Sequence, residues 1–380
     1  MRLKVWIVAG LFSTLGLAAL VGGTLCLSSG CGSVGYLAQA AAGHLNLLAA
    51  ARPVSELQRE GQLPQALEER LALSQRMRDF AIETLKLPDN HSYRSYADLH
   101  RPAAVWNVVA APELSLQLQT WCFPVVGCVG YRGYYSLADA QSAAEDLRRP
   151  GTEVAVYPVP AYSTLGMSNL LGGDPLLSTF VQWPEGELAR LMFHELAHQV
   201  VYAAGDTVFN ESFATSVERL GGEIWLRDHA DSQARDQYLI FDGRRHDFRA
   251  LLERHRQSLD ALYRGPLPED LKRAAKTAEM ADLQAEYQSL KSGRWAGYGG
   301  YDGFMRQVNN PLLGVQGAYH RWVPAFDRLF EREGRDFGRF YAAVRHLADL
   351  PAPLRRVELE QLDVAAGTAA AAASGPAGLP

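Results

Sequence analysis

The chain has 380 residues, of which 48% are apolar and 21% are charged, and its formal net charge is −5. These proportions are ordinary for a folded globular protein, so they exclude wholesale disorder, a collagen-like repeat and a membrane protein with many spans. Because there is no excess of basic residues to neutralise phosphate groups, we expect no nucleic-acid partner.

The N-terminus has the character of an export segment. Arg2 and Lys4 precede an uncharged stretch, Val5–Leu27, that is long enough to span a bilayer. The small residues before Cys31 resemble the cleavage box of bacterial lipoproteins, in which that cysteine carries the lipid, although Ser28 stands where such boxes usually have leucine. An uncleaved anchor helix is the alternative. In both cases we expect the rest of the chain to be exported and held at the membrane on the periplasmic side.

Helical sequence follows from about 33 to 90, where apolar residues recur at spacings of three and four. From about 103 to 165, β-branched and aromatic residues predict strands, interrupted by one helix at about 137–149. Cys122 and Cys128 lie in this stretch, and in an oxidising compartment they can form a short-loop disulfide. Two buried free thiols are the alternative.

A second helical block is predicted from about 184 to 290, and its later part, about 227–290, has the charged pattern of a hairpin or insertion with solvated faces. The tail from about 365 is rich in alanine and glycine and is expected to be disordered. We therefore predict a mainly helical α+β fold with one small sheet. Its expected segments are a signal segment at 1–30, one folded domain at 31–364 and a low-complexity tail at 365–380.

One segment carries a recognisable chemical pattern. His194, Glu195 and His198 form H-E-x-x-H in an apolar helix that Trp183-Pro184-Glu185 begins and Gly205 ends. Histidines four residues apart leave the same helix face and can bind one tetrahedral ion, for which zinc is well suited. Glu195 can then reach a water on that ion, which is the position of a general base. Two core histidines with hydrogen-bond partners are the alternative.

A catalytic site of this kind needs a third protein ligand. Glu211 and Glu218 lie seven residues apart on one face of the next predicted helix, which a turn at Gly205-Asp206 would bring back antiparallel to the first. Glu211 can complete the ligand set while Glu218 holds a ligand histidine by a hydrogen bond. Exchanged roles, or a surface position for Glu211, stay open. The apolar stripe of this helix lies on another face and consists of Phe209, Phe213, Val217 and Leu220.

HELAHQ followed by NESFA resembles the gluzincin metallopeptidases, in which an Asn-Glu pair after the H-E-x-x-H helix supplies the glutamate ligand. The chain is also similar to a bacterial family of lipoprotein-like predicted aminopeptidases. The resemblance implies a gluzincin-like catalytic core in which the H-E-x-x-H helix packs on the small sheet. It also implies one zinc ion on His194, His198 and Glu211, with Asn210 and Glu218 behind the ligands. The matching segments span most of residues 28–347 and read SGCGSVGYLAQAAAGHLNLL, WCFPVVGCVGYRGYY, VPAYSTLG, FHELAHQVVY, GDTVFNESFATSVE and VPAFDRLFEREGRDFGRFYAAV.

Two further elements are implied by the same resemblance. Gluzincins use a tyrosine or histidine to stabilise the oxyanion, and the candidates here are Tyr319 and His320, which alternatively only begin a core helix. Gluzincins also hold the substrate backbone along an edge strand that precedes the H-E-x-x-H helix. In this chain the segment in that position offers Tyr162, Ser163, Thr164 and Gly166 as candidate substrate-binding residues. The alternative is that this segment is only a strand end followed by a turn.

The expected function is that of an exported zinc metallopeptidase, of the aminopeptidase class, with Glu195 as the general base and a peptide as substrate. The alternative is a non-enzymatic envelope lipoprotein in which zinc joins two helices and the surface binds a partner. The sequence favours the enzyme, because a structural zinc site does not need the H-E-x-x-H glutamate. Hydrolysis of cell-wall peptide or another amide is a third possibility. We identify no acidic group for a free α-amine from the sequence.

Overall fold

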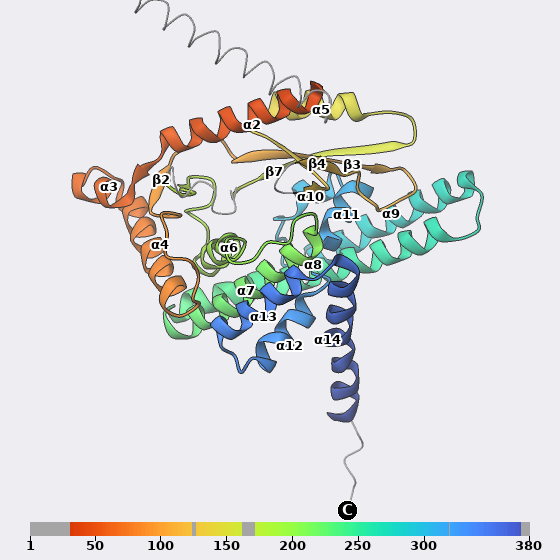
Figure 1. Cartoon of the computed structure of the whole chain (residues 1–380). Helices are drawn as coiled ribbons and strands as arrows, with labels where there is room; N and C mark the ends of the chain where they lie inside the picture. The colour runs from red at the N-terminus through yellow and green to blue at the C-terminus, as the bar shows by residue number, and fades with distance from the viewer. Residues whose placement is uncertain (1–30, 124–126, 162–171, 319, 374–380) are drawn as a thin grey trace, which may run out of the picture.

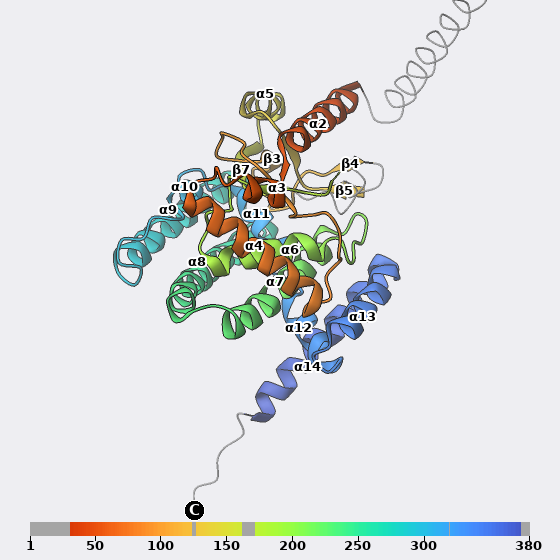
Figure 2. The same cartoon turned by 90° about the vertical axis from the view of Figure 1, so that its left-hand side faces the viewer.

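The computed structural model describes residues 31–123, 127–161, 172–318 and 320–373 (Figure 1). The predicted signal segment therefore lies outside the described residues. The described chain is mainly helical with small sheets, as the sequence predicted. In both Figure 1 and Figure 2, helices α2 (Cys31–Ala50) and α5 (Leu137–Leu147) lie at one end of the molecule. Helices α6 (Glu185–Ala197) and α7 (Thr207–Asp228) lie on the far side of strand β3 (Val105–Pro112) from them.

The N-terminal helices have boundaries that their proline residues explain. Helix α3 (Val54–Glu60) begins after Pro53, and α4 (Gln65–Glu83) begins after Pro64, because proline fits the start of a helix, where a missing N–H costs no hydrogen bond. The buried face of α4 includes Met77 and Phe80, which belong to the main apolar core together with residues of α6 and α7. Burial of each such side chain stabilises the fold by about 1.5–3 kcal/mol.

The strands form three small sheets among the described residues, where the sequence predicted a single one. Strand β3 is the central strand of the sheet β6-β3-β7 and pairs antiparallel with both neighbours. All its residues are buried except the last one, Pro112, which is exposed. Its run of apolar residues, interrupted only by the buried Asn107, suits a strand that is covered on both faces. The sheets are β1-β2-β8, β6-β3-β7 and β4-β5, with β1 Arg52–Pro53, β2 Ser95–Ala97, β4 Trp121–Phe123, β5 Gly127–Val129, β6 Arg132–Tyr134, β7 Thr152–Val159 and β8 Leu176–Leu177.

Helix α6, which carries the H-E-x-x-H pattern, packs against helices and not against the central sheet as the sequence reading expected. Its main neighbours are α7, α4 and α8, while α5 and α11 (Asn310–Ala318) contact the central sheet. The apolar residues of α6 explain this arrangement, because Leu188, Met192, Phe193 and Leu196 are all fully buried in one core with the apolar stripe of α7. The prediction of a sheet packed by this helix is therefore not confirmed, although Ala97, Val105 and Leu176 of the strands belong to the same apolar core.

Helices α8 (Ser232–Arg264) and α9 (Glu269–Ser292) form a hairpin that extends to one side in Figure 1. An apolar cluster separate from the main core lies between the two helices of the hairpin. The loop after α9 and helix α11 also contribute side chains to this cluster. Asp242 and Arg245 of α8 form ion pairs with Arg190 and Glu187 of α6, so the base of the hairpin lies against the helix that carries the histidines.

The C-terminal helices pack on α7 and end in an extended helix. Helix α14 (Ala352–Ala373) contributes Arg355, whose guanidinium binds Asp206 at the start of α7. The structure differs from the predicted disordered tail in that α14 continues to Ala373. Its AAGTAAAAA sequence explains this, because alanine has the highest intrinsic helix propensity. The remaining helices are α10 Asp302–Met305, α12 Val323–Arg332 and α13 Phe337–Asp349.

Candidate metal centre

The helix that carries the H-E-x-x-H pattern begins as predicted and ends earlier than predicted. Pro184 is its N-cap residue, and Glu185 and Glu187 lie in the first turn, where negative charge stabilises a helix. The helix ends at Ala197, eight residues before Gly205, and His198 follows as the C-cap residue with helical dihedral angles of −59° and −23°. His198 therefore still lies on the same side of the chain as His194.

A hydrogen-bonded loop connects this helix to α7. The Asn210 side chain accepts a hydrogen bond from the Ala203 N–H and donates one to the Ala203 carbonyl, both at 2.8 Å. Asp206 is the N-cap residue of α7 and accepts from the Phe209 N–H at 3.0 Å. The expectation that Asn210 lies behind the metal ligands stays a prediction. Its amide is used by the loop backbone, and it acts by fixing the turn that brings α7 back beside α6.

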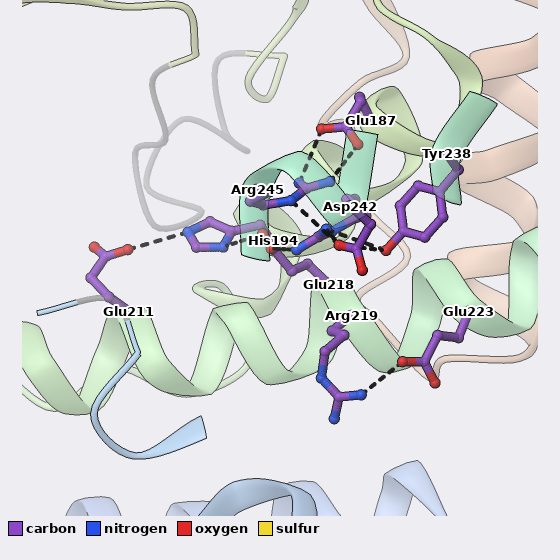
Figure 3. Close-up of polar contacts among 10 residues, drawn as sticks. Glu187, His194, Glu211, Glu218, Arg219, Glu223, Tyr238, Asp242 and Arg245 are labelled. Atoms are coloured by element: carbon purple, nitrogen blue, oxygen red, sulfur yellow. Dashed lines mark hydrogen bonds and ion pairs between the residues drawn. The ribbon is translucent and has the colours of Figure 1, made fainter. Parts of the chain in front are cut away.

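His194, His198 and Glu211 converge on one point (Figure 3 draws His194 and Glu211). The His194 Nε2 lies 3.2 Å from the His198 Nε2 and 3.2 Å from the Glu211 Oε2. The third side of the triangle, from His198 Nε2 to Glu211 Oε2, is 3.7 Å. Two atoms bound to one tetrahedral ion at about 2.0–2.1 Å lie about 3.3 Å apart. The three atoms therefore have the spacing of a three-ligand metal site, and two imidazoles with a carboxylate are donors that suit zinc.

The electrostatics of this group agree with a site for a cation. Burial acts to lower the pKa of His194, but its contacts with Glu211 and Glu218 outweigh burial and raise that pKa well above the ordinary value. Burial acts to raise the pKa of Glu211, but the two histidines lower it to about 2. Glu211 is thus a carboxylate at neutral pH, although only 13% of its side chain is exposed.

Glu218 lies on the other side of the His194 ring from Glu211 (Figure 3). The His194 Nδ1 donates to the Glu218 Oε2 at 2.9 Å, which directs the Nε2 lone pair toward Glu211 and His198. Glu218 also binds the Arg190 guanidinium, which is buried and reaches Asp242 at 3.2 Å. Glu211 thus lies in the group with His194 and His198 that could hold a metal ion, and Glu218 lies behind the His194 ring.

Arg190 was missed by the sequence analysis. It lies four residues before His194 in an apolar helix, with only 3% of its side chain exposed. Burial and its carboxylate partners oppose each other, and the partners keep the pKa of Arg190 above its ordinary value. The unusual feature that could have revealed it is an arginine at a core position of an amphipathic helix, which requires a buried acidic partner.

Glu195, the predicted general base, lies beside the convergent group. Burial raises the pKa of its carboxyl group, the two neighbouring histidines lower it, and the net direction is upward. The charges of Glu211 and Asp174 contribute to the upward shift. A carboxyl group whose pKa is raised toward neutral is better suited to accept and return a proton.

In a comparison with protein-family models, residues 35–359 match the family described as "Putative aminopeptidase". The chain belongs to that putative aminopeptidase family. Membership supports a peptidase at a coarse level, and all the residues described above lie within the matched range. Neither a search of curated proteins nor a search of solved structures gave a significant match.

Three tyrosines whose pKa is raised by the Glu211 charge were also missed in the sequence analysis of this aminopeptidase-family chain. Burial and the Glu211 charge raise the pKa of Tyr131, Tyr202 and Tyr157, the last to about 12. The Tyr157 hydroxyl also accepts from the Asn107 amide at 3.2 Å. All three tyrosines keep their protons at neutral pH and can donate hydrogen bonds. No local sequence pattern indicates these tyrosines, because they come near Glu211 only through strand pairing and the α6–α7 loop.

Of the predicted oxyanion residues, His320 is described and Tyr319 lies outside the described residues. Burial lowers the pKa of His320 to about 3, and nearby Arg249 adds to the shift. The charges of Glu218 and His194 also affect this pKa, and His320 is neutral at pH 7. The predicted substrate strand also lies outside the described residues; it consists of Tyr162, Ser163, Thr164 and Gly166.

Cys122 and Cys128 form a disulfide across the hairpin β4-β5. The start of strand β5 contacts the α6–α7 loop: Gly127 has φ +77°, and a Cβ there would lie 2.5 Å from the Gly205 nitrogen. Only glycine fits this close approach at positive φ. The hairpin thus supports the loop after His198 from outside.

Cys31, the predicted lipid attachment site, is the first residue of α2. Among the helices that the structure describes, none has the length and apolar composition needed to cross a bilayer. The predicted anchor lies before Cys31, outside those residues.

Proposed function

We propose that the chain is a zinc-dependent metallopeptidase of the aminopeptidase class. The observation that carries the proposal is the triangle of His194 Nε2, His198 Nε2 and Glu211 Oε2, with sides of 3.2, 3.2 and 3.7 Å. Two histidines and one glutamate are the ligand set of known catalytic zinc sites, which leave the fourth position open. The ligand order along the chain resembles that of the gluzincins, and family membership supports peptidase chemistry.

When bound, zinc would supply a Lewis acid that polarises the scissile carbonyl and acidifies water. The residues of the chain would perform the proton transfers. The Glu195 carboxylate accepts a proton from the attacking water and returns it to the leaving amine. Glu218 holds the Nδ1–H of His194, so the ring presents its Nε2 to the ligand position. Arg190 in turn holds Glu218 in place.

The oxyanion that forms at the scissile carbonyl needs a hydrogen-bond donor, and Tyr131 is the best described candidate. Its pKa is raised by burial and by the Glu211 charge, so its hydroxyl keeps the proton. Tyr157 is a weaker candidate, because Asn107 already binds its hydroxyl. We keep Tyr319 and His320 as further candidates, and His320 would act as a neutral donor.

We further propose that the substrate is a peptide and that the protein acts on the periplasmic side of the membrane, anchored by residues 1–30 or by a lipid on Cys31. This rests on the N-terminal sequence. The alternative, an envelope lipoprotein with a structural zinc site, is less favoured. It gives no reason for Glu195 to lie beside the ligand group with a raised pKa.

The experiment compares wild type with Glu195→Gln, each lacking residues 1–31. Zinc content is measured first, followed by hydrolysis of aminoacyl substrates and of internally quenched peptides. We expect about one zinc per chain in both proteins and hydrolysis by the wild type alone, mainly of aminoacyl substrates. Zinc without hydrolysis of any substrate would support the structural alternative. Absence of zinc from both proteins would refute the metal site.

A further inference from the structure

A cavity of about 640 Å³ lies next to the candidate metal centre, on the Glu218 side. Its wall combines residues of α6, α7, α8, α11 and α12, among them Thr215 and Pro324, with His320 from the segment between α11 and α12. The three proposed metal ligands are not part of the wall. The volume is in the range of sites that bind small molecules or side chains of a substrate.

The wall of this cavity is strongly basic. Five arginines line it, and Glu253 is the one carboxylate in the lining. Three of the arginines have acidic partners: Arg190 binds Glu218, Arg219 binds Asp327, and Arg256 binds Glu253 at 2.7 Å. The other two arginines are Arg249 and Arg321.

Arg249 is different from the others because it is partly buried and makes no hydrogen bond or ion pair within the described residues. Burial lowers the pKa of its guanidinium to about 10, the Arg190 charge adds to the shift, and the charges of Glu218 and Asp242 oppose it only in part. A partly buried guanidinium whose N–H groups have no direct acceptor is costly for the fold. Arg321, in contrast, is exposed to solvent and rests on the Trp322 ring, so it needs no counter-ion.

The cavity lies at a distance that a bound peptide can reach. Thr215 and Arg219 follow Glu211 on α7 by one and two helical turns, which places them about 6 and 12 Å along the helix from the candidate ligand. An extended peptide advances about 3.3 Å per residue. A substrate whose scissile carbonyl lies at the metal centre can therefore place a group two to four residues away in the cavity.

We propose that this cavity is a substrate subsite in which Arg249 binds a carboxylate, from either the C-terminus of a short peptide or an acidic side chain. The proposal rests on the proposed peptidase function. A guanidinium offers a planar pair of N–H donors that matches a carboxylate. Arg249 makes no direct hydrogen bond or ion pair within the described residues, so its donors match the single negative charge of that group.

The test measures peptide binding to the zinc-loaded Glu195→Gln protein by calorimetry. The probes are tetra-alanine with a free C-terminal carboxylate, tetra-alanine amide, and the amide with glutamate as its last residue. We expect one of the two peptides with a carboxylate to bind at least about 10-fold more tightly than tetra-alanine amide, because a hydrogen bond to a charged group contributes a difference of this size. Tighter binding of tetra-alanine identifies the C-terminal carboxylate as the bound group, and tighter binding of the glutamate peptide identifies an acidic side chain.

The deciding variants carry Arg249→Gln or Arg254→Gln in addition to Glu195→Gln. Arg254 lies on the same helix in an exposed ion pair with Glu286, so its loss is the matched control. We expect Arg249→Gln to abolish the preference, Arg249→Lys to keep part of it, and Arg254→Gln to keep all of it. Equal affinity for all three peptides, or an unchanged preference in Arg249→Gln, would overturn the subsite. Absence of hydrolysis by the wild type would refute the peptidase instead.

Discussion

Replacement of Glu218 by glutamine tests whether this carboxylate supports the metal centre from behind. Glu218 lies 2.9 Å from the Nδ1 of His194 and also binds Arg190. Loss of an outer carboxylate partner of a ligand histidine typically lowers metal affinity 10–100-fold. We therefore expect the zinc dissociation constant of Glu218→Gln to rise by that factor, which corresponds to about 1.4–2.7 kcal/mol.

The same substitution also affects stability without metal. Removal of one partner from a buried ion pair costs about 3–5 kcal/mol. Here we expect a smaller loss of about 2 kcal/mol in the free energy of unfolding, because Asp242 still lies 3.2 Å from the Arg190 guanidinium and the glutamine oxygen can accept a hydrogen bond. The two effects are separated by measuring zinc affinity with a competing chromophoric chelator and unfolding by urea in the presence of a strong chelator.

Glu223→Gln is the control for both measurements. Glu223 lies on the same helix and pairs with Arg219 at 2.7 Å, but it is half exposed (Figure 3). An exposed pair of this kind contributes less than about 1 kcal/mol. Unchanged zinc affinity in Glu218→Gln, or an equal loss in Glu223→Gln, would refute the role assigned to Glu218.

Three further predictions test the surrounding site. In steady-state kinetics, Tyr131→Phe should lower kcat about 100-fold with little change in KM, whereas Tyr157→Phe should have little effect. Equal kcat values for the two variants would contradict the role of Tyr131. The pKa of Glu211 is depressed to about 2, so in metal-free protein its contribution to stability is present above pH 4.5 and lost as the pH falls toward 2. Glu211→Gln should flatten acid unfolding over that window, and an unchanged curve would contradict this. Gly127→Ala should destabilise the protein by about 1–3 kcal/mol in thermal unfolding, because its Cβ would meet the Gly205 backbone; no loss of stability would argue against that contact.

The convergence of His194, His198 and Glu211 followed from the sequence because helical spacing decides it. Residues four apart at the end of α6 and seven apart on α7 share a helix face, and the stripe from Phe209 to Leu220 fixes which face of α7 is buried. Once α6 and α7 lie antiparallel, Glu211 and Glu218 both reach His194. The pattern of charge and apolar residues was therefore sufficient for this part of the site.

Features that depend on contacts between distant segments were not predictable in the same way. The apolar residues after His198 continue a helical pattern, yet the helix ends at Ala197. The turn that follows is held by the side chain of Asn210, which binds the backbone of Ala203, seven residues earlier in the chain. Tyr131 reaches the Glu211 charge only because the β4–β6 region lies beside the α6–α7 loop. Such contacts have no periodic signal in the sequence.

The measurement that tests the central claim most directly is a zinc titration of the metal-free protein during hydrolysis of an aminoacyl substrate. Our account predicts that activity is absent in chelator, rises linearly with added zinc and reaches a plateau at about one equivalent per chain. His194→Gln should show no plateau in the same range, because it removes one corner of the ligand triangle. Full hydrolysis by the zinc-free protein, or stoichiometric zinc binding without any hydrolysis, would contradict a zinc peptidase.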